Sequence, residues 1–337
     1  MGPSAAVAEV RNAVRGCLSD LAGGDLVLVA CSGGADSLAL AAAAAFVAPR
    51  LSLRVGAVTV DHGLQPGSAQ RAAGVVALLG KFGLAPVRSI AVTVPSAGTA
   101  GAAQGPEAAA RQARYGALDM VAEDCGAAAI LLGHTLDDQA ETVLLGLARG
   151  SGARSLAGMP ARRGAYRRPL LTVRRATTGQ ACADLGLDPW QDPHNSDFRY
   201  TRARVRHQAL PALEAALGPG VTEALARTAS QLRADAELLD DLASAESRQV
   251  PESDQGLDAR WLLALPAAFR TRVLRDASVM AGCPHGSLTA GHVEQVDALV
   301  TRWRGQRWVD LPGGVRARRQ RGKVWITSTE EDQAGRA

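Results

Sequence analysis

The stretch from Leu26 to Ala45, LVLVACSGGADSLALAAAAA, decides the fold of this 337-residue chain. Its apolar run ends at Ala30, two adjacent glycines follow at Gly33 and Gly34, and an alanine-rich segment comes directly after them. This order predicts a buried strand, a tight turn and a helix. Backbone N–H groups at the start of a helix point towards whatever precedes it, and the helix dipole favours an anion there. The turn is therefore a candidate anion site.

Further strand-like segments recur along the chain, and the segments between them have apolar residues at helical spacing. The expected strands are 26–30, 55–60, 87–94 and 128–132, and the expected helices between them are 36–48, 68–83 and 107–123. This alternation predicts an α/β fold with a parallel, Rossmann-like sheet and helices on both of its faces. Ligands of such sheets bind beyond the carboxyl ends of the strands, so the loops after the strands are the candidate site.

The pattern changes after about residue 210, where LPALEAALGPG ends in a Gly-Pro-Gly break. A long amphipathic helix is expected over 221–247, and shorter helices over 267–281 and 287–303, the last capped by Ser287. Two alternating stretches on either side of Pro312-Gly313-Gly314 predict a β-hairpin. We expect a catalytic domain over 1–215, a mainly helical domain ending in the hairpin over 216–328, and a disordered tail over 329–337.

Composition sets broad limits on the function. The formal net charge of +4 permits a polyanionic partner without requiring one. The five cysteines show no C-x-x-C pair, which predicts free thiols in a reducing compartment. The N-terminus lacks the pattern of a signal peptide, and the apolar run 38–48 is too short to span a bilayer. We expect a soluble cytoplasmic protein without a membrane partner, and the sequence gives no indication of its oligomeric state.

The residues of the glycine turn suit phosphate. Gly33 and Gly34 allow close approach of the backbone, Ser32 and Ser37 add hydroxyl donors, and a carboxylate such as Asp36 beside phosphates generally holds magnesium. No lysine completes a P-loop, and the G-x-G-x-x-G pattern of dinucleotide sites is absent. The alternative is a structural turn in which Ser32 or Asp36 caps the helix.

A second candidate loop, GHTLDDQAET at 133–142, is strongly acidic. Thr135 is placed to cap a helix with Asp137 and Asp138 in its first turn, and Glu141 shares a face with Asp137. The helix dipole alone favours carboxylates in a first turn, so they need no ligand. Three such groups nevertheless repel one another, and a bound cation would relieve the repulsion.

The pattern S-G-G-x-D-S after a first strand resembles the PP-loop of the N-type ATP pyrophosphatases. Five later blocks are similar, in order, to the tRNA(Ile)-lysidine synthases of that family: VDHGLQPGSAQ, EAAARQARYGAL, GHTLDDQAET followed by ARGSGARSLAGM, RRPLL, and DPHNSDFRYTRARVRHQALP. The similarity is dense over about residues 20–215 and loose beyond. It implies the cofactors ATP and Mg²⁺, and the partners free L-lysine and tRNA(Ile) with the CAU anticodon. The implied reaction passes through an adenylated wobble cytidine to lysidine, AMP and pyrophosphate.

The resemblance also implies roles for individual residues. The implied ATP-binding residues are Ser32, Gly33, Gly34, Ala35, Asp36, Ser37, His62 and His134, with Asp36 also as metal ligand and catalytic residue. Arg111 and Arg114 would lie at the α-phosphate of ATP. Asp137 and Glu141 would hold the lysine cation, and Asp138 would orient it or a metal. The implied tRNA-binding residues are Asn195, Arg199, Arg202 and Arg206, whose arginines fall at helical spacings that would follow a phosphate backbone.

Two residues depart from the family pattern, and three other functions stay open. His194 stands where the family more often has a small hydroxyl residue, and Ala203 where it often has asparagine. One alternative is a PP-loop tRNA thiolase, which normally needs paired cysteines. Another is an AMP-forming amide ligase for a small metabolite, which would not need the DPHN block. The third is a non-catalytic nucleotide-binding module, in which the acidic and arginine-bearing loops would have no purpose.

Overall fold

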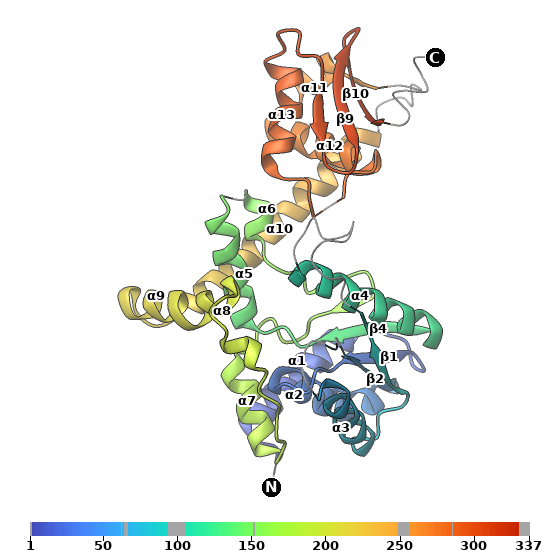
Figure 1. The fold of residues 1–337 in the computed structure, drawn as a ribbon, viewed down its shortest axis with the longest axis vertical. Coiled ribbons are helices and arrows are strands. Elements are labelled where there is room, and N and C mark those ends of the chain that lie inside the picture. The colour runs from blue at the N-terminus through green and yellow to red at the C-terminus, as the bar shows by residue number, and fades with distance from the viewer. Residues whose placement is uncertain are drawn as a thin grey trace. The chain divides into compact units, whose positions relative to one another are not determined.

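The computed structural model describes residues 2–61, 63, 67–93, 106–150, 152–248, 256–284 and 286–329. The chain forms two compact units (Figure 1). The first comprises Met1–Leu145 and Gly158–Arg227, and the second comprises Gly146–Ala157 and Thr228–Ala337. The division between the units therefore falls within the long helix α10 (Val221–Arg248). No helix among the described residues is long and apolar enough to cross a membrane.

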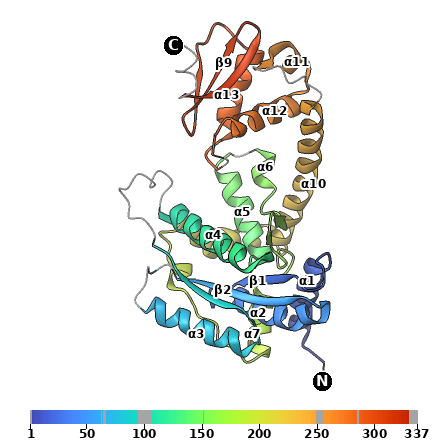
Figure 2. The same cartoon turned by 90° about the vertical axis from the view of Figure 1, so that its right-hand side faces the viewer.

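A six-stranded sheet with the order β3-β2-β1-β4-β6-β5 forms the centre of the first unit (Figures 1 and 2). Its strands are β1 (Leu26–Ala30), β2 (Arg54–Asp61), β3 (Val87–Ala91), β4 (Ala127–Leu132), β5 (Arg162–Arg163) and β6 (Tyr166–Arg167). Only β5 pairs antiparallel with its neighbour; the other pairs are parallel. The predicted parallel sheet is confirmed, with β1 at its centre, so the glycine turn leaves the middle of the carboxyl edge.

Helices cover both faces of this sheet, as expected. The helices of the first unit are α1 (Ala5–Leu18), α2 (Ala35–Val47), α3 (Ser68–Lys81), α4 (Pro106–Cys125), α5 (Leu136–Ala148), α7 (Arg175–Asp184), α8 (Thr201–Arg204) and α9 (Leu210–Leu217). Helices α1, α2 and α7 pack against one another and share one core with α3, whereas the core on the opposite face includes residues of α4. The small alanine side chains of α2 let its neighbours approach on several sides, and Leu38 and Leu40 are almost completely buried.

The second unit packs helices against a four-stranded antiparallel sheet of order β7-β10-β9-β8. Its strands are β7 (Leu257–Asp258), β8 (Val309–Leu311), β9 (Val315–Gln320) and β10 (Lys323–Ser328). Its helices are α6 (Ala153–Leu156), most of α10, α11 (Ala259–Ala264), α12 (Ala267–Met280) and α13 (Ala290–Thr301). Leu262, Leu274 and Leu299 are nearly inaccessible at the centre of its core.

The structure corrects one expectation for the C-terminal half and confirms and extends another. The cap of α13 is Thr289 and not Ser287: Thr289 accepts a hydrogen bond from the His292 N–H at 3.3 Å, and His292 Nδ1 accepts one from the Thr289 N–H at 3.1 Å. The predicted turn at Pro312–Gly314 joins β8 to β9, but the chain turns again at Arg321 and Gly322, with φ of 49° and 79°. Arginine rarely adopts positive φ, so its identity gave no signal for this second hairpin.

Gly56 provides a test of packing at the centre of the first sheet. A Cβ at this position would lie 2.5 Å from the Pro86 carbonyl oxygen and 2.9 Å from Leu28 Cδ2. We expect Gly56→Ala to destabilise the unit by about 1–3 kcal/mol, measured as a lower urea midpoint of unfolding. Gly74→Ala on α3 is the matched control, because no atom lies within 4 Å of its Cβ and alanine favours a helix. An unchanged midpoint for Gly56→Ala would contradict this account.

Candidate active site

The glycine turn between β1 and α2 is folded by hydrogen bonds among its own residues. Ser37 Oγ accepts a hydrogen bond from the Ser32 N–H at 3.2 Å and donates one to the Gly34 carbonyl at 2.9 Å. Gly33 has a φ of 86°, and a Cβ there would lie 2.8 Å from Val75 Cγ2, so a side chain is excluded twice over. The residue that caps α2 is Gly34, so neither Ser32 nor Asp36 does. Without a side-chain cap, the N–H groups of the first turn are available to an anion.

The end of β4 lies directly against this turn. A Cβ on Gly133 would come within 3.2 Å of the Asp36 backbone and of the Ser37 nitrogen. Glycine therefore permits the contact that brings His134 and the acidic helix α5 beside the turn. On the other side, the Trp190 N–H donates to the Gly33 carbonyl at 3.0 Å. The turn is thus fixed between segments that are remote in sequence.

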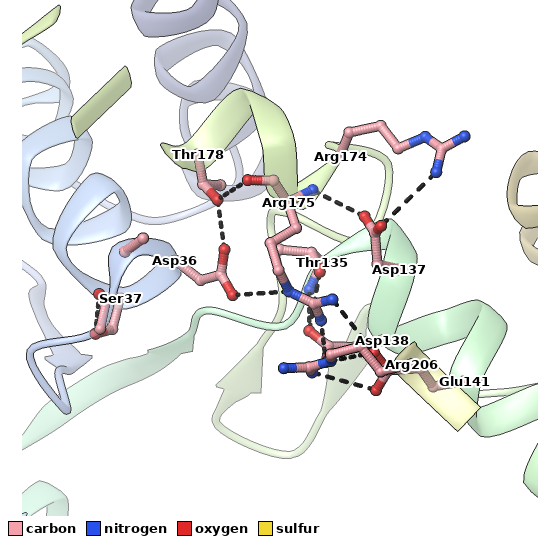
Figure 3. A network of polar contacts seen from close by, with 12 residues as sticks. Asp36, Ser37, Thr135, Asp137, Asp138, Glu141, Arg174, Arg175, Thr178 and Arg206 are labelled. Carbon is pink, nitrogen blue, oxygen red and sulfur yellow. Dashed lines mark hydrogen bonds and ion pairs between the residues drawn. The ribbon is translucent and has the colours of Figure 1, made fainter. Parts of the chain in front are cut away.

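Asp36 is partly buried and has partners on both carboxylate oxygens (Figure 3). Thr178 Oγ1 donates to Oδ1, and the Arg175 Nε lies 3.5 Å from Oδ2. Burial raises the pKa of Asp36 above its usual value, because the loss of solvation outweighs the opposing effects of Thr178 and Arg175. The described residues contain no group of three His, Cys, Asp or Glu side chains able to hold a metal. A single carboxylate fits a magnesium ion that is held mainly by phosphates and water.

Arginines of the chain itself neutralise the acidic helix. Glu141 is completely buried, and its carboxylate lies 2.8 Å from Arg202, 2.8 Å from Arg206 and 3.2 Å from Arg175. Asp138 lies 2.9 Å from Arg175 and accepts hydrogen bonds from the Thr135 N–H at 2.8 Å and the Thr135 hydroxyl at 3.0 Å. These arginines therefore relieve the repulsion among the three carboxylates, for which the sequence had suggested a bound cation. Thr135 precedes α5, but its side chain donates to Asp138.

Asp137 has different partners from the other two carboxylates. It accepts a hydrogen bond from the Arg175 N–H at 2.8 Å, and Arg174 lies 3.7 Å away (Figure 3). Its side chain is 21% exposed, against 0% for Glu141. The two residues share a helical face in sequence, but their side chains differ in exposure. Asp137 is the more accessible of the two.

The expected tRNA-binding arginines point in two directions. Arg202 and Arg206 turn inward to Glu141. Their expected contact with a phosphate backbone stays a prediction. Only Arg199 is strongly exposed, with 83% of its side chain accessible and an ion pair of 2.6 Å to Asp197. Arg199 departs from the helical spacing because it precedes α8, which begins at Thr201 and continues into a π-helical turn over Val205–Ala209. The side chain of Asn195 and all of His62 lie outside the described residues.

Arg114 and His134 carry buried polar atoms without partners. Arg114 Nε has no hydrogen-bond acceptor, and its guanidinium carbon lies 5.6 Å from the centre of the Tyr115 ring. Burial lowers the pKa of Arg114. His134 Nδ1 is also unpartnered, and burial lowers the pKa of this ring to about 3, against the opposing charge of Asp138. His134 is therefore neutral at physiological pH, and no described carboxylate pairs with Arg114.

Sequence reasoning missed the residues that organise this site. Arg175 and Thr178 at the start of α7 contact Asp36, and Arg175 also reaches Asp138. Tyr115 lies among the arginines of α4 and also contacts Arg168. The RRPLL block was a possible signal for Arg168, since it adjoins a loop at the carboxyl edge. Nothing in the local sequence distinguishes Arg175 from an exposed arginine.

Asp36→Asn should raise thermal stability and abolish activity. The amide keeps the acceptor for Thr178 but has no buried charge. The pKa of Asp36 is higher in the folded than in the unfolded protein, so the protonated side chain stabilises the fold at low pH. This stabilisation is lost as the pH rises through the pKa of the folded state. The melting temperature of the variant should therefore exceed that of the wild type increasingly between acid and neutral pH. A gap that shrinks with rising pH would contradict the argument.

Comparison with known proteins places the chain in a family. A family model described as a PP-loop domain matches residues 8–213, and one described as a TilS substrate binding domain matches residues 257–325. The tRNA(Ile)-lysidine synthase of Thermobifida fusca is 61% identical over 327 residues, which cover 97% of this chain and 99% of that protein. The synthase of Streptomyces coelicolor is 55% identical over 355 residues, with the same coverage of 97% and 99%.

A solved structure shares the fold at much lower identity. The U34-tRNA thiolase NcsA from Methanococcus maripaludis, determined with its 4Fe-4S cluster, gives a TM-score of 0.56 at 18% identity. The match covers 68% of this chain and 80% of that chain, and it supports the fold alone. The relatives with 55–61% identity extend over nearly the whole chain. The chain therefore belongs to the tRNA(Ile)-lysidine synthase family and contains its PP-loop domain.

Proposed function

We propose that this protein uses ATP to join free lysine to C2 of the wobble cytidine of tRNA(Ile) with the CAU anticodon. The observation that carries the proposal is the identity of 61% to a tRNA(Ile)-lysidine synthase over 97% of the chain. The geometry supports it independently. An uncapped helix start, an Arg114 without a carboxylate partner among the described residues, and a neutral His134 lie at the carboxyl edge of the sheet, next to an acidic helix.

The first half-reaction is adenylation of the cytidine. Its C2 carbonyl oxygen attacks the α-phosphorus of ATP, the bond to the β-phosphate breaks, and pyrophosphate leaves. In our proposal the N–H groups after Gly34 hold the departing pyrophosphate, and Arg111 and Arg114 stabilise the charge that develops on the α-phosphate. Bound Mg²⁺ would reduce the negative charge of the phosphates, with Asp36 as its protein ligand. Thr178 and Arg175 hold that carboxylate in place beside the turn.

The second half-reaction joins lysine to the activated base. The ε-amine attacks C2, AMP leaves with the oxygen, and the amine gives up a proton. We assign the contact with the lysine cation to Asp137. It is more exposed than Glu141, and its ion pair with Arg174 is long, at 3.7 Å. Glu141 then acts through Arg202 and Arg206, whose positions it fixes. Asp138 connects Thr135 at the start of α5 to Arg175.

Binding of tRNA would involve the second unit, which matches the substrate-binding model over residues 257–325. Arginine and tryptophan side chains stack on one another in this unit. The guanidinium carbons of Arg307 and Arg316 lie 5.0 and 4.6 Å from the Trp308 ring, and that of Arg319 lies 5.0 Å from the Trp303 ring. Trp303 is 46% exposed, which suits contact with RNA phosphates and bases. No observation favours the thiolase, the small-metabolite ligase or a non-catalytic module over this function.

The decisive assay incubates the protein with ATP, magnesium, labelled lysine and a tRNA(Ile) transcript that carries CAU. We expect label in the tRNA together with stoichiometric AMP and pyrophosphate. The control is a methionine tRNA with the same anticodon, which should remain unlabelled. No incorporation, or equal incorporation into both tRNAs, would refute the proposal.

Arg114→Gln should lower kcat by about 10²–10³-fold, because a preorganised charge at the α-phosphate acts mainly in the transition state.

Asp137→Asn should instead raise the KM for lysine by at least about tenfold, since it removes a charge-assisted contact with the cation. Steady-state rates with each substrate varied in turn separate the two effects. A rise in KM for lysine alone in the Arg114 variant would contradict its assignment.

A further inference from the structure

Tyr115 on α4 collects three guanidinium groups around one side chain. Arg111 Nη2 donates to the Tyr115 hydroxyl at 3.2 Å, and Arg168 Nη2 approaches the same oxygen at 3.5 Å. Arg114 lies over the ring. Arg168 directly follows β6, so these arginines come from two segments that are far apart in sequence. The arrangement concentrates positive charge on one phenol.

Tyr166 packs against Tyr115 and holds it in place. The Tyr166 ring packs edge to face against Tyr115, with ring centres 4.9 Å apart. The Tyr166 hydroxyl lies 2.5 Å from Asp119 Oδ1, which accepts its hydrogen bond, and 3.2 Å from the Tyr115 carbonyl oxygen. Asp119 is a carboxylate of the same helix, and this bond directs it to Tyr166 and away from the arginines. Tyr115 can therefore act as a fixed support for the charges around it.

Arg168 is buried without a counter-ion in the part of the chain that the structure describes. It is 5% exposed, its Nη1 donates to the Pro160 carbonyl at 2.9 Å, and its Nε has no partner. Arg114 Nε is unpartnered as well. By contrast, Arg175 is paired with Asp138 and Glu141. A buried guanidinium without an anion is costly, which points to an anion that completes the cluster.

The cluster lies beside the glycine turn. Strand β6 pairs in parallel with β4, with Arg167 beside Leu131, so Arg168 and His134 follow neighbouring strands at the same edge of the sheet. The preceding residue, Gly133, contacts the backbone of the turn. An anion bound to these arginines would therefore lie next to the site assigned to pyrophosphate.

We propose that Arg168 and Tyr115 complete a phosphate site with Arg111 and Arg114, and that Arg168 binds a phosphate group of the nucleotide. The inference rests on the proposed function for the identity of that nucleotide as ATP. Guanidinium forks match pairs of phosphate oxygens, and buried arginines lose little hydration on pairing. The Tyr115 oxygen accepts from two cationic donors, which leaves its own hydrogen to donate to the phosphate. A backbone phosphate of the tRNA has the same chemistry, but the burial of Arg168 beside the glycine turn favours the nucleotide.

The test measures nucleotide binding without chemistry. Full-length Arg168→Met, Arg168→Lys and Tyr115→Phe are titrated calorimetrically with α,β-methylene-ATP, from which no pyrophosphate can leave. We expect Arg168→Met to weaken binding about tenfold or more, Arg168→Lys less because it keeps the charge, and Tyr115→Phe about threefold. The control is Arg88→Gln, an exposed arginine on β3, which should bind as the wild type does. Melting curves verify folding, and Arg168→Lys serves if Arg168→Met does not fold.

Unchanged analogue affinity in a folded Arg168→Met variant would overturn the inference. If that variant also binds tRNA more weakly, with a salt dependence reduced by about one phosphate contact, the site belongs to the tRNA backbone. The binding assay needs neither lysine nor tRNA. If the wild type forms no lysidine but Arg168→Met still weakens analogue binding, only the proposed function is refuted. If the wild type forms lysidine and Arg168→Met leaves the analogue affinity unchanged, only this inference is refuted.

Discussion

The buried carboxylate of Glu141 is the constraint on which the rest of the site depends. It has no access to solvent, so its charge must be neutralised within the protein. Three guanidinium groups meet this requirement, from Arg175 at the start of α7, Arg202 on α8 and Arg206 in the π-helical turn. A single buried charge thereby fixes the path of the chain from α7 to the end of the π-helical turn. The same arginines determine how Asp138 and Asp36 are presented.

The arginines of the site fall into two groups, those with carboxylate partners and those without one among the described residues. Arg175, Arg202 and Arg206 are paired with carboxylates, and we assign them a positioning role. Arg114 and Arg168 have no carboxylate partner among the described residues. A site for a polyanionic nucleotide and a cationic amino acid needs both conditions. The phosphates need unpaired arginines, whereas an ammonium group would be repelled by them.

The sequence was sufficient for the fold of the first unit because its signals are local. An apolar strand, a glycine turn and a buried alanine helix are each determined by neighbouring residues, and their alternation implies a parallel sheet. The site depends instead on pairings across long distances in sequence, such as Arg175 with Asp36 and Arg206 with Glu141. Helical spacing placed Arg202 and Arg206 on one face, but it could not show that this face turns inward. The π-helical turn that carries Arg206 has no reliable local signature either.

Asp36 shows why such a site is retained despite its cost to stability. A carboxylate with a raised pKa is less favourable in the folded protein than in water, so the fold gains nothing from its charge. Thr178 and Arg175 hold it in place but do not fully compensate for its burial. The charge becomes useful only when a cation accompanies the phosphates at the turn, because attraction to that cation then replaces the missing hydration. The fold therefore keeps this carboxylate in a preorganised position, at the expense of some stability, for the cation that we propose binds with the phosphates.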